Sequence, residues 1–300
     1  EVMGGKGKIF ITGEVTSKAS VDLENIVKRV LTDVGYDTNY EIINNLGKQS
    51  PDIAMGTNDE VGGAGDQGMM FGYAVNDTKE LLPTAMVILQ RFSKWYDKER
   101  LNCPYLRSDG KAEITGYYDD KMKLKKIKYF TISYQNDELH RDYTDALIKE
   151  ACLNICKDYD IEIEEFLINP TGKFEIGGFE GDSGLTGRKI VVDSYQSFAR
   201  VGGGSFSGKD PTKVDRSATY KARLIAKDYL KRYNLSWCEV VISYAIGIDK
   251  PLSIYIDSDK GYIEPDESLY IECTPKNIIK DLDLLNICYE EKARFGHFQD

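Results

Sequence analysis

The sequence predicts an α+β fold in which mixed and largely antiparallel sheets carry helices on one face. Segments of alternating or β-branched apolar residues recur along the chain, as strands do. Several are joined by short turns, such as residues 119–120 and 170–172, which favours antiparallel pairing over a βαβ winding. The strand–strand–helix order also recurs, which indicates internal duplication.

The elements follow from these patterns in chain order. Strands are expected at residues 8–15, 41–46, 113–118, 127–134, 166–169, 189–195, 239–245 and 252–256. Helices are expected at residues 21–34, 82–96, 143–158 and 214–233, where apolar residues recur every three or four positions. Ser20 is the expected N-cap of the first helix and Gly35 its stop. The stretch GAGDQGMMFGYA, residues 63–74, fits a polar turn that leads into an apolar helix or strand.

Composition limits the partners. The 300 residues suffice for two or three compact units, and 49 acidic against 39 basic residues give a net charge of -10. This surplus of acid argues against general nucleic-acid binding. No apolar run approaches the ~20 residues that span a bilayer, so no membrane partner is expected. The one-turn spacing of Cys152 and Cys156 favours helix packing over a disulfide or zinc site, as in a reduced, cytoplasmic protein.

The stretch GGGSFSGKDPTKVDRS, residues 202–217, fits the phosphate-loop pattern until Asp210 replaces the hydroxyl residue that would bind magnesium. Its glycines also lie too far beyond the expected strand at 189–195 for that loop. An alternative phosphate site remains. If a helix begins at Pro211, Lys209 and Lys213 share a face at its N-terminus, which favours polyanions. Asp215 is a suitable ligand for a hard divalent metal. The competing interpretation is a solvated helix start with surface lysines.

Two further glycine-rich loops, residues 62–68 and 177–187, carry charged residues, although plain structural turns are the alternative. Arg188 and Lys189 form a second cationic pair, and the carboxylate of Asp182 could hold an ammonium group. Phe174 fits either the core or a platform for a purine ring. The only histidines are His140 and His297, so histidine metal sites and nucleophilic catalysis are disfavoured. The remaining chemistry is oxygen-ligated magnesium with lysine and arginine.

The chain resembles the S-adenosylmethionine synthetase family over essentially its full length. The resemblance rests on GAGDQG (63–68) and GGGSFSGKDPTKVDRS (202–217), supported by GKQSPDI, INPTGKF, GDSGLTGRKIVVD and SYAIG in order. It implies three similar α+β units about a pseudo-threefold axis, with interleaved segments. The implied regions are residues 1–52, 63–176 and 177–300, with a gating loop at 50–62. It also implies a homodimer or homotetramer whose subunits pack sheet to sheet, with active sites at that interface.

The resemblance also implies a reaction in which the sulfur of L-methionine attacks C5′ of ATP. Tripolyphosphate leaves and is hydrolysed to pyrophosphate and phosphate, with Mg²⁺ and K⁺ as cofactors. The residues implied for catalysis are Lys209, Lys213, Arg188, Lys189 and Lys111. Those implied for ATP binding are Asp109, Lys111, Lys173, Phe174, Arg188, Lys189, Lys209, Lys213 and Ile246. Those implied for methionine are Glu14, Gln49, Asp182 and Lys213, with Asp215 as magnesium ligand and Glu1 as potassium ligand.

One departure leaves an alternative open. The family's Ser-Glu-Gly-His-Pro-Asp-Lys segment, which supplies a histidine and a second magnesium-binding aspartate, does not occur in these 300 residues. Because the sequence starts at Glu1 rather than methionine and stops just after an aromatic stretch, we expect it to be part of a longer chain. If the segment were truly missing, the alternative is a non-catalytic homologue or regulatory subunit that binds nucleotide or partner subunits.

Overall fold

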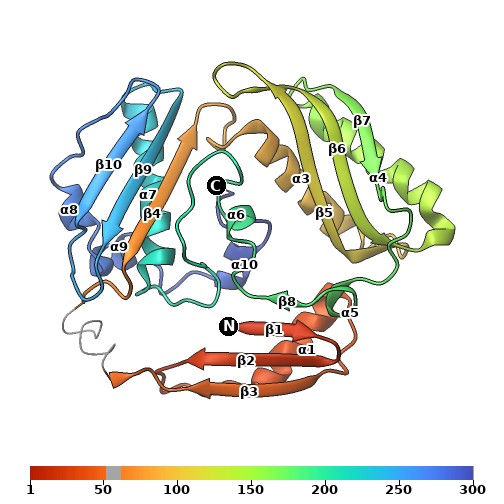
Figure 1. The fold of residues 1–300 in the computed structure, drawn as a ribbon, viewed down its shortest axis with the longest axis horizontal. Coiled ribbons are helices and arrows are strands. Elements are labelled where there is room, and N and C mark those ends of the chain that lie inside the picture. Colours follow the sequence, from red (N-terminus) through yellow and green to blue (C-terminus); the bar gives the residue numbers. More distant parts are fainter. Residues whose placement is uncertain (52–61, 300) are drawn as a thin grey trace. The chain divides into compact units, whose positions relative to one another are not determined.

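The computed structural model describes residues 1–51 and 62–299 and confirms the α+β fold. Its strands form three small sheets, with orders β3-β2-β1-β8, β10-β9-β4 and β5-β6-β7 (Figure 1). The chain divides into two compact units. Unit 1 comprises residues 1–47 and 84–185, and unit 2 comprises residues 48–83 and those from 186 onward. Both units are therefore built from segments that are distant in the sequence.

The first sheet of unit 1 packs against a single helix. Its elements are β1 (Val2–Gly5), β2 (Lys8–Glu14), α1 (Leu23–Val34), β3 (Glu41–Gly47) and β8 (Gly184–Leu185). Strands β1 and β2 are antiparallel, whereas β2 and β3 are parallel and joined through α1. Ile9 and Ile11 alternate along β2 and bury their side chains against Leu31 of α1. Among the described elements, no long helix covers the opposite face of this sheet.

The second sheet of unit 1 carries two long helices. Its elements are α3 (Thr84–Glu99), β5 (Leu106–Tyr118), β6 (Leu124–Asn136), η1 (Glu138–His140), α4 (Arg141–Lys157) and β7 (Ile163–Ile168). The short helix α5 (Gly178–Gly181) instead packs Phe179 against the core of the first sheet. The predicted turn at 119–120 does join β5 to β6 as an antiparallel hairpin. Strand β7 pairs with β6 in parallel, after α4. Ile127 and Phe130 of β6 are fully buried.

The sheet of unit 2 packs against the longest helix of the described chain. The elements are β4 (Gly68–Val75), α6 (Ile190–Asp193), α7 (Val214–Arg232), β9 (Trp237–Tyr244), β10 (Ser253–Ser258), α8 (Leu269–Glu272), α9 (Pro275–Asp281) and α10 (Tyr289–Ala293). In Figure 1, β9 lies between β4 and β10. A Cβ at Gly72 of β4 would lie 2.0 Å from the backbone carbon of Ala222 in α7. Glycine is therefore required there because the strand and helix backbones touch.

Several sequence predictions were wrong. Residues 189–195 form no strand, because α6 and a turn occupy them. The turn at 170–172 follows β7 but leads into no strand. The parallel pairs β2–β3 and β6–β7, beside antiparallel ones, make the sheets mixed, as predicted. Helix α7 begins at Val214, as the pattern over residues 214–233 predicted, and not at Pro211, the alternative start. The N-cap of α1 is Asp22 rather than Ser20, although Gly35 does end the helix in the left-handed conformation.

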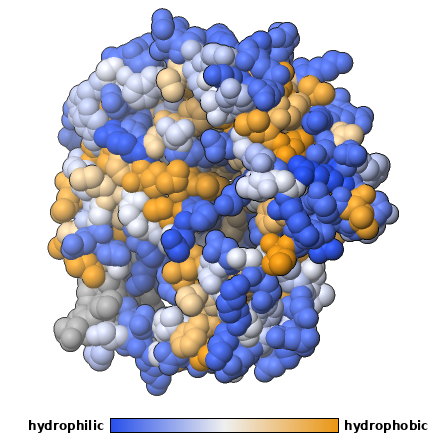
Figure 2. Space-filling view, turned by 45° about the vertical axis from the view of Figure 1, so that its right-hand side comes forward, coloured by the Kyte–Doolittle hydropathy of each residue, from blue (hydrophilic) through white to orange (hydrophobic). Residues whose placement is uncertain are grey.

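The remaining global expectations concern cysteines and membranes. Cys152 and Cys156 are free and buried in α4, as predicted, and burial raises the pKa of Cys156 to about 12. Within the described ranges, no helix has both the length and the apolar composition needed to cross a bilayer. On the face drawn in Figure 2, hydrophilic residues predominate and hydrophobic ones gather in smaller patches between them.

Candidate active site

Three of the glycine-containing motifs meet within unit 2. A Cβ at Gly65, in GAGDQG, would lie 2.9 Å from Cδ of Lys213, so this motif packs directly on the lysine. The Ala64 N–H donates to the Ile248 carbonyl at 2.9 Å, and the Gly247 N–H donates to the Ala64 carbonyl at 2.9 Å. Residues 63–68, 202–217 and 243–248 are thus one continuous surface region, although they are distant in the sequence.

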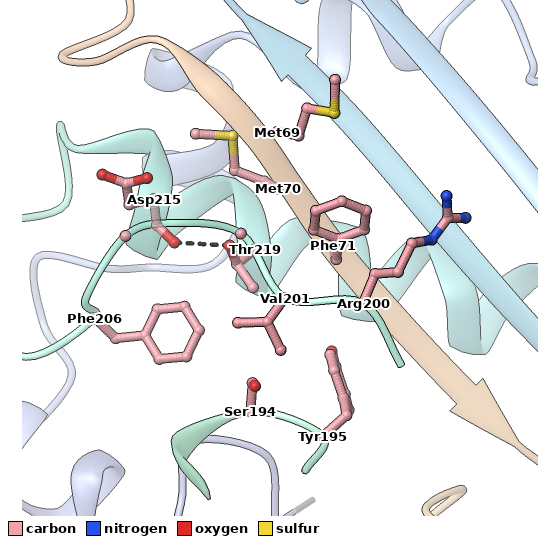
Figure 3. A pocket seen from close by; sticks show the side chains of 12 residues that line it. Met69, Met70, Phe71, Ser194, Tyr195, Arg200, Val201, Phe206, Asp215 and Thr219 are labelled. Carbon is pink, nitrogen blue, oxygen red and sulfur yellow. Dashed lines mark hydrogen bonds between the residues drawn. The ribbon is translucent and has the colours of Figure 1, made fainter. Parts of the chain in front are cut away.

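The glycine loop, residues 202–213, lies against the end of β4. A Cβ at Gly202 would lie 2.5 Å from the Met69 carbonyl oxygen, so only glycine allows this approach. Side chains of Phe71, Val201 and Phe206 close the space beneath the loop (Figure 3). They leave a cavity of about 10 Å³, roughly the least that holds one water. The loop is therefore packed on the sheet, and any ligand must bind on its outer side.

Lys209 and Asp215 form an ion pair at the end of this loop. Nζ of Lys209 donates to Oδ2 of Asp215, and the two side chains are 25% and 12% exposed. Asp215 lies in the first turn of α7, where the helix dipole stabilises a negative charge. Its carbonyl oxygen accepts a 2.7 Å hydrogen bond from Oγ1 of Thr219, which is drawn in Figure 3. The carboxylate thus lies at a helix N-terminus and already faces a cation.

In the glycine-loop region, the carboxylate of Asp215 is the candidate ligand for a magnesium ion. Within residues 1–51 and 62–299, no three His, Cys, Asp or Glu side chains gather as a metal cluster. Magnesium usually needs only one or two carboxylates, because water and substrate phosphates complete its octahedron. Asp215 meets that requirement, since its carboxylate is positioned to bind a cation. Glu1, the expected potassium ligand, is exposed at the start of β1.

The three other implied phosphate-binding cations of unit 2 lie in or beside the glycine loop. Lys213 is the N-cap of α7 rather than a residue of its first turn, so the predicted shared helical face with Lys209 is wrong. Arg188 and Lys189 are exposed. They follow Gly187, at which a Cβ would lie 2.9 Å from that of Ser205 in the glycine loop. The structure thus brings the cationic pair next to the loop that carries Lys209.

A buried polar cluster that the sequence analysis missed anchors the loop from behind. Arg216 is 3% exposed; its Nε donates to the Phe206 carbonyl at 2.7 Å, and its guanidinium lies 4.2 Å from the ring centroid of Tyr289. His297, 1% exposed, packs its ring 4.9 Å from that of Phe206. The position of Arg216 directly after Asp215 was a signal for this cluster, but a single arginine in a helix is ordinarily solvated.

His297 is neutral in this cluster. Its Nδ1 lies 2.7 Å from the hydroxyl of Tyr220, and its backbone N–H donates to the Asp193 carbonyl at 3.0 Å. Burial, followed by the nearby charges of Arg216 and Lys292, lowers the pKa of His297 to about 4. The buried ring of His297 therefore contributes packing beneath the glycine loop.

Four of the implied ATP-binding residues lie in unit 1, and a fifth, Ile246, lies in unit 2. Asp109 of β5 accepts a 2.8 Å hydrogen bond from the Gly178 N–H, and Lys111 is exposed on the same strand. Lys173 pairs with Glu175 at 2.5 Å, and this hydrogen bond raises the pKa of Lys173. Two hydrophobic residues complete the set: Phe174 is half-buried in unit 1, and Ile246 is 46% exposed in unit 2.

The implied methionine-binding carboxylates are separated within unit 1. Glu1 and Thr12 exchange two backbone hydrogen bonds, which places Glu14 beyond the Glu1 end of β1. Asp182 precedes β8, whose Gly184 pairs with Gly4 near the other end of β1. At about 3.3 Å per residue, the two residues differ by on the order of 20 Å along the strands. One copy of unit 1 therefore does not bring Glu14 and Asp182 together.

Two predictions involve the segment after β3. Gln49 is half-buried and lies two residues beyond the strand. The expected gating loop at 50–62 falls almost entirely outside the described residues.

Unit 2 also contains a larger cavity than the small space under the glycine loop. Its volume is about 590 Å³, and it is lined by residues including Leu224, Leu284 and Phe298. None of the predicted site residues lines it.

Comparison with known proteins agrees with the motifs. Residues 61–174 match the central domain of S-adenosylmethionine synthetase, and residues 176–300 match its C-terminal domain. An S-adenosylmethionine synthase of Sulfurovum sp. is 40% identical over 321 residues, covering 99% of this chain and 83% of the relative. One from Fusobacterium nucleatum is 38% identical over 319 residues, covering 99% and 82%. The chain therefore belongs to the S-adenosylmethionine synthetase family.

Proposed function

We propose that the protein makes S-adenosylmethionine from ATP and L-methionine, releases tripolyphosphate and hydrolyses it to pyrophosphate and phosphate. As a member of a synthetase family it is an enzyme of the transferase class. One observation carries the proposal: Lys213, Asp215 and the GAGDQG loop converge on the glycine loop of unit 2. This is a surface suited to a polyanion and its metal.

The proposed chemistry needs no protein nucleophile. The methionine sulfur displaces the triphosphate, so the barrier falls mainly through alignment and through neutralisation of the leaving group. Lys209, Lys213 and the Arg188–Lys189 pair would bind the phosphate chain. Bound magnesium, held by Asp215, would supply further positive charge to the phosphates. Of the implied residues outside this loop, Phe174 and Ile246 would contact adenine, Asp109, Lys111 and Lys173 the rest of ATP, and Glu1 potassium.

We also propose that two copies of the chain share the methionine site. Glu14 and Asp182 lie at opposite ends of β1 and so cannot meet in one chain. An uncovered apolar row crosses the first sheet of unit 1, on the face opposite α1. It runs through cross-strand neighbours Ile43, Phe10, Met3 and Leu185, of which the last three are 40%, 51% and 43% exposed. A symmetric dimer that packs these faces would bury the row and supply both carboxylates.

The test is synthesis by the full chain. Incubation with ATP, L-methionine, Mg²⁺ and K⁺ should yield S-adenosylmethionine together with pyrophosphate and phosphate, measured by mass spectrometry and phosphate assay. Lys213→Ala and Asp215→Ala should each lower the rate by roughly a hundredfold or more. Lys149→Ala, which removes an exposed lysine of α4, is the matched control and should leave the rate unchanged. Near-normal rates in the first two variants would refute their assigned roles.

A further inference from the structure

The Lys209–Asp215 ion pair occupies the carboxylate that is the candidate magnesium ligand. Nζ of Lys209 contacts Oδ2 of Asp215, and neither side chain forms another ion pair within the residues that the structure describes. The carboxylate is also enclosed: Gly204 lies so close that a Cβ there would fall 2.1 Å from Cγ of Asp215. With its side chain only 12% exposed, Asp215 has little open surface apart from the side that Lys209 covers.

A divalent ion and the ammonium group of Lys209 cannot both bind the carboxylate of Asp215 without strong repulsion. Both seek the same oxygen, and two cations within ~4 Å repel strongly in a partly buried site. A metal at Asp215 therefore requires Lys209 to move away. Lys209 directly follows Gly208 in the glycine loop, and the Lys209 side chain has a flexible four-carbon stem that is long enough to swing outward.

We propose that Lys209 and the divalent metal exchange at Asp215. In this inference, which rests on the proposed function, Lys209 stays paired with Asp215, the metal ligand, until substrate binds. The phosphate chain then attracts the ammonium group, and the metal takes the vacated carboxylate. Metal binding and polyphosphate binding thus assist one another, because each favours the same open state of the ion pair. Lys209 thus blocks the carboxylate of Asp215 when substrate is absent. Once it leaves Asp215, Lys209 binds phosphate.

The first experiment measures metal binding without any phosphate. Mn²⁺, which accepts the same oxygen ligands as Mg²⁺, is titrated into the full chain and the free ion is followed by electron paramagnetic resonance. Lys209→Met should bind Mn²⁺ on the order of tenfold more tightly than wild type. Lys213→Met is the matched control, because it removes an equal neighbouring charge that is not paired with Asp215. The gain should disappear in the Lys209→Met/Asp215→Asn double variant.

Two outcomes of this titration would overturn the exchange. Equal shifts in Lys209→Met and Lys213→Met would mean that only overall charge matters. A gain that survives Asp215→Asn would place the metal elsewhere. Lys209→Gln is the second variant, should Lys209→Met lose its native circular dichroism.

The second experiment uses the wild-type chain. Labelling of lysine amines by a reagent such as acetic anhydride is quantified by peptide mass spectrometry. Mg²⁺ should increase labelling of Lys209 in wild type but not in Asp215→Asn, where the amine is already released. Labelling that does not change although the metal binds at Asp215 would contradict the exchange. Neither readout needs turnover, so both can fail while S-adenosylmethionine still forms, and a failure of synthesis leaves them interpretable.

Discussion

At the scale of single residues, the glycine triplet is the most restrictive feature of the site. Gly204 leaves room for Asp215, since a Cβ there would lie 2.1 Å from its Cγ, whereas a Cβ at Gly203 would meet nothing within 4 Å. The motif predicted a glycine-rich ligand loop from the sequence. It could not show which glycine is indispensable, because that depends on a carboxylate folded back from α7.

Gly204→Ala should therefore displace Asp215 while the protein remains folded. We expect kcat to fall by roughly a hundredfold, since misplacement of a group by about 1 Å has effects of that size. Mn²⁺ affinity should weaken in parallel. Gly203→Ala is the matched control and should keep both values. Equal loss in the two variants, or a large drop in melting temperature for Gly204→Ala alone, would show that the loop rather than Asp215 is disturbed.

His297 makes stability depend on pH. Burial lowers its pKa to about 4 from an ordinary value of 6.5. Between those values the unfolded chain binds a proton that the folded chain does not, so the free energy of unfolding falls as the pH drops from about 6.5 to 4. The full effect is on the order of 3 kcal/mol. Urea unfolding at pH 7 and pH 5 should show a smaller difference for His297→Gln than for wild type. His140→Gln, the only other histidine variant, should retain the wild-type difference.

At the scale of elements, helices were predictable and several strands were not. The helices at 21–34, 82–96, 143–158 and 214–233 all exist within a few residues, because a long amphipathic period is a strong signal. The β-branched run Ile190–Asp193 suggested a strand but forms one helical turn, since no described strand is there to pair with it. Strand β4 stayed ambiguous because glycine interrupts it, and Gly72 is explained only by the contact with α7.

The N-cap of α1 is Asp22 in the structure, whereas the sequence pattern predicted Ser20. Oδ1 of Asp22 accepts a hydrogen bond from the Asn25 N–H at 3.0 Å, which satisfies one of the free amides of the first turn. Asp22→Ala should lower the free energy of unfolding by about 1 kcal/mol. Ser20→Ala, which removes the cap expected from the sequence alone, should change it by less than about 0.5 kcal/mol. Urea denaturation at pH 7 measures both. If Ser20→Ala lowered the free energy of unfolding more than Asp22→Ala, Ser20 rather than Asp22 would be the N-cap.

At the scale of the whole molecule, the sequence could indicate three sheets but not which segments pair. Strand β4 joins β9 across more than half of the chain, and β8 adds a two-residue edge to β1. Pairings between distant segments leave no local pattern, and the resemblance to a family implied interleaved segments without saying which strands pair. The same holds for the separation of Glu14 from Asp182, which appears only once the register of β1 is known.

That separation gives the sharpest test of a shared site. If one subunit supplies Glu14 and its partner supplies Asp182, then Glu14→Ala and Asp182→Ala chains should each be inactive alone. A mixed dimer would contain one site with both substitutions and one site with neither. Random assembly after co-expression makes half of the dimers mixed, so activity should recover to about a quarter of wild type. Two chains that both carry Glu14→Ala are the control and should remain inactive. No recovery in the mixture, with mixed dimers demonstrated by native mass spectrometry, would mean that each chain builds its own site.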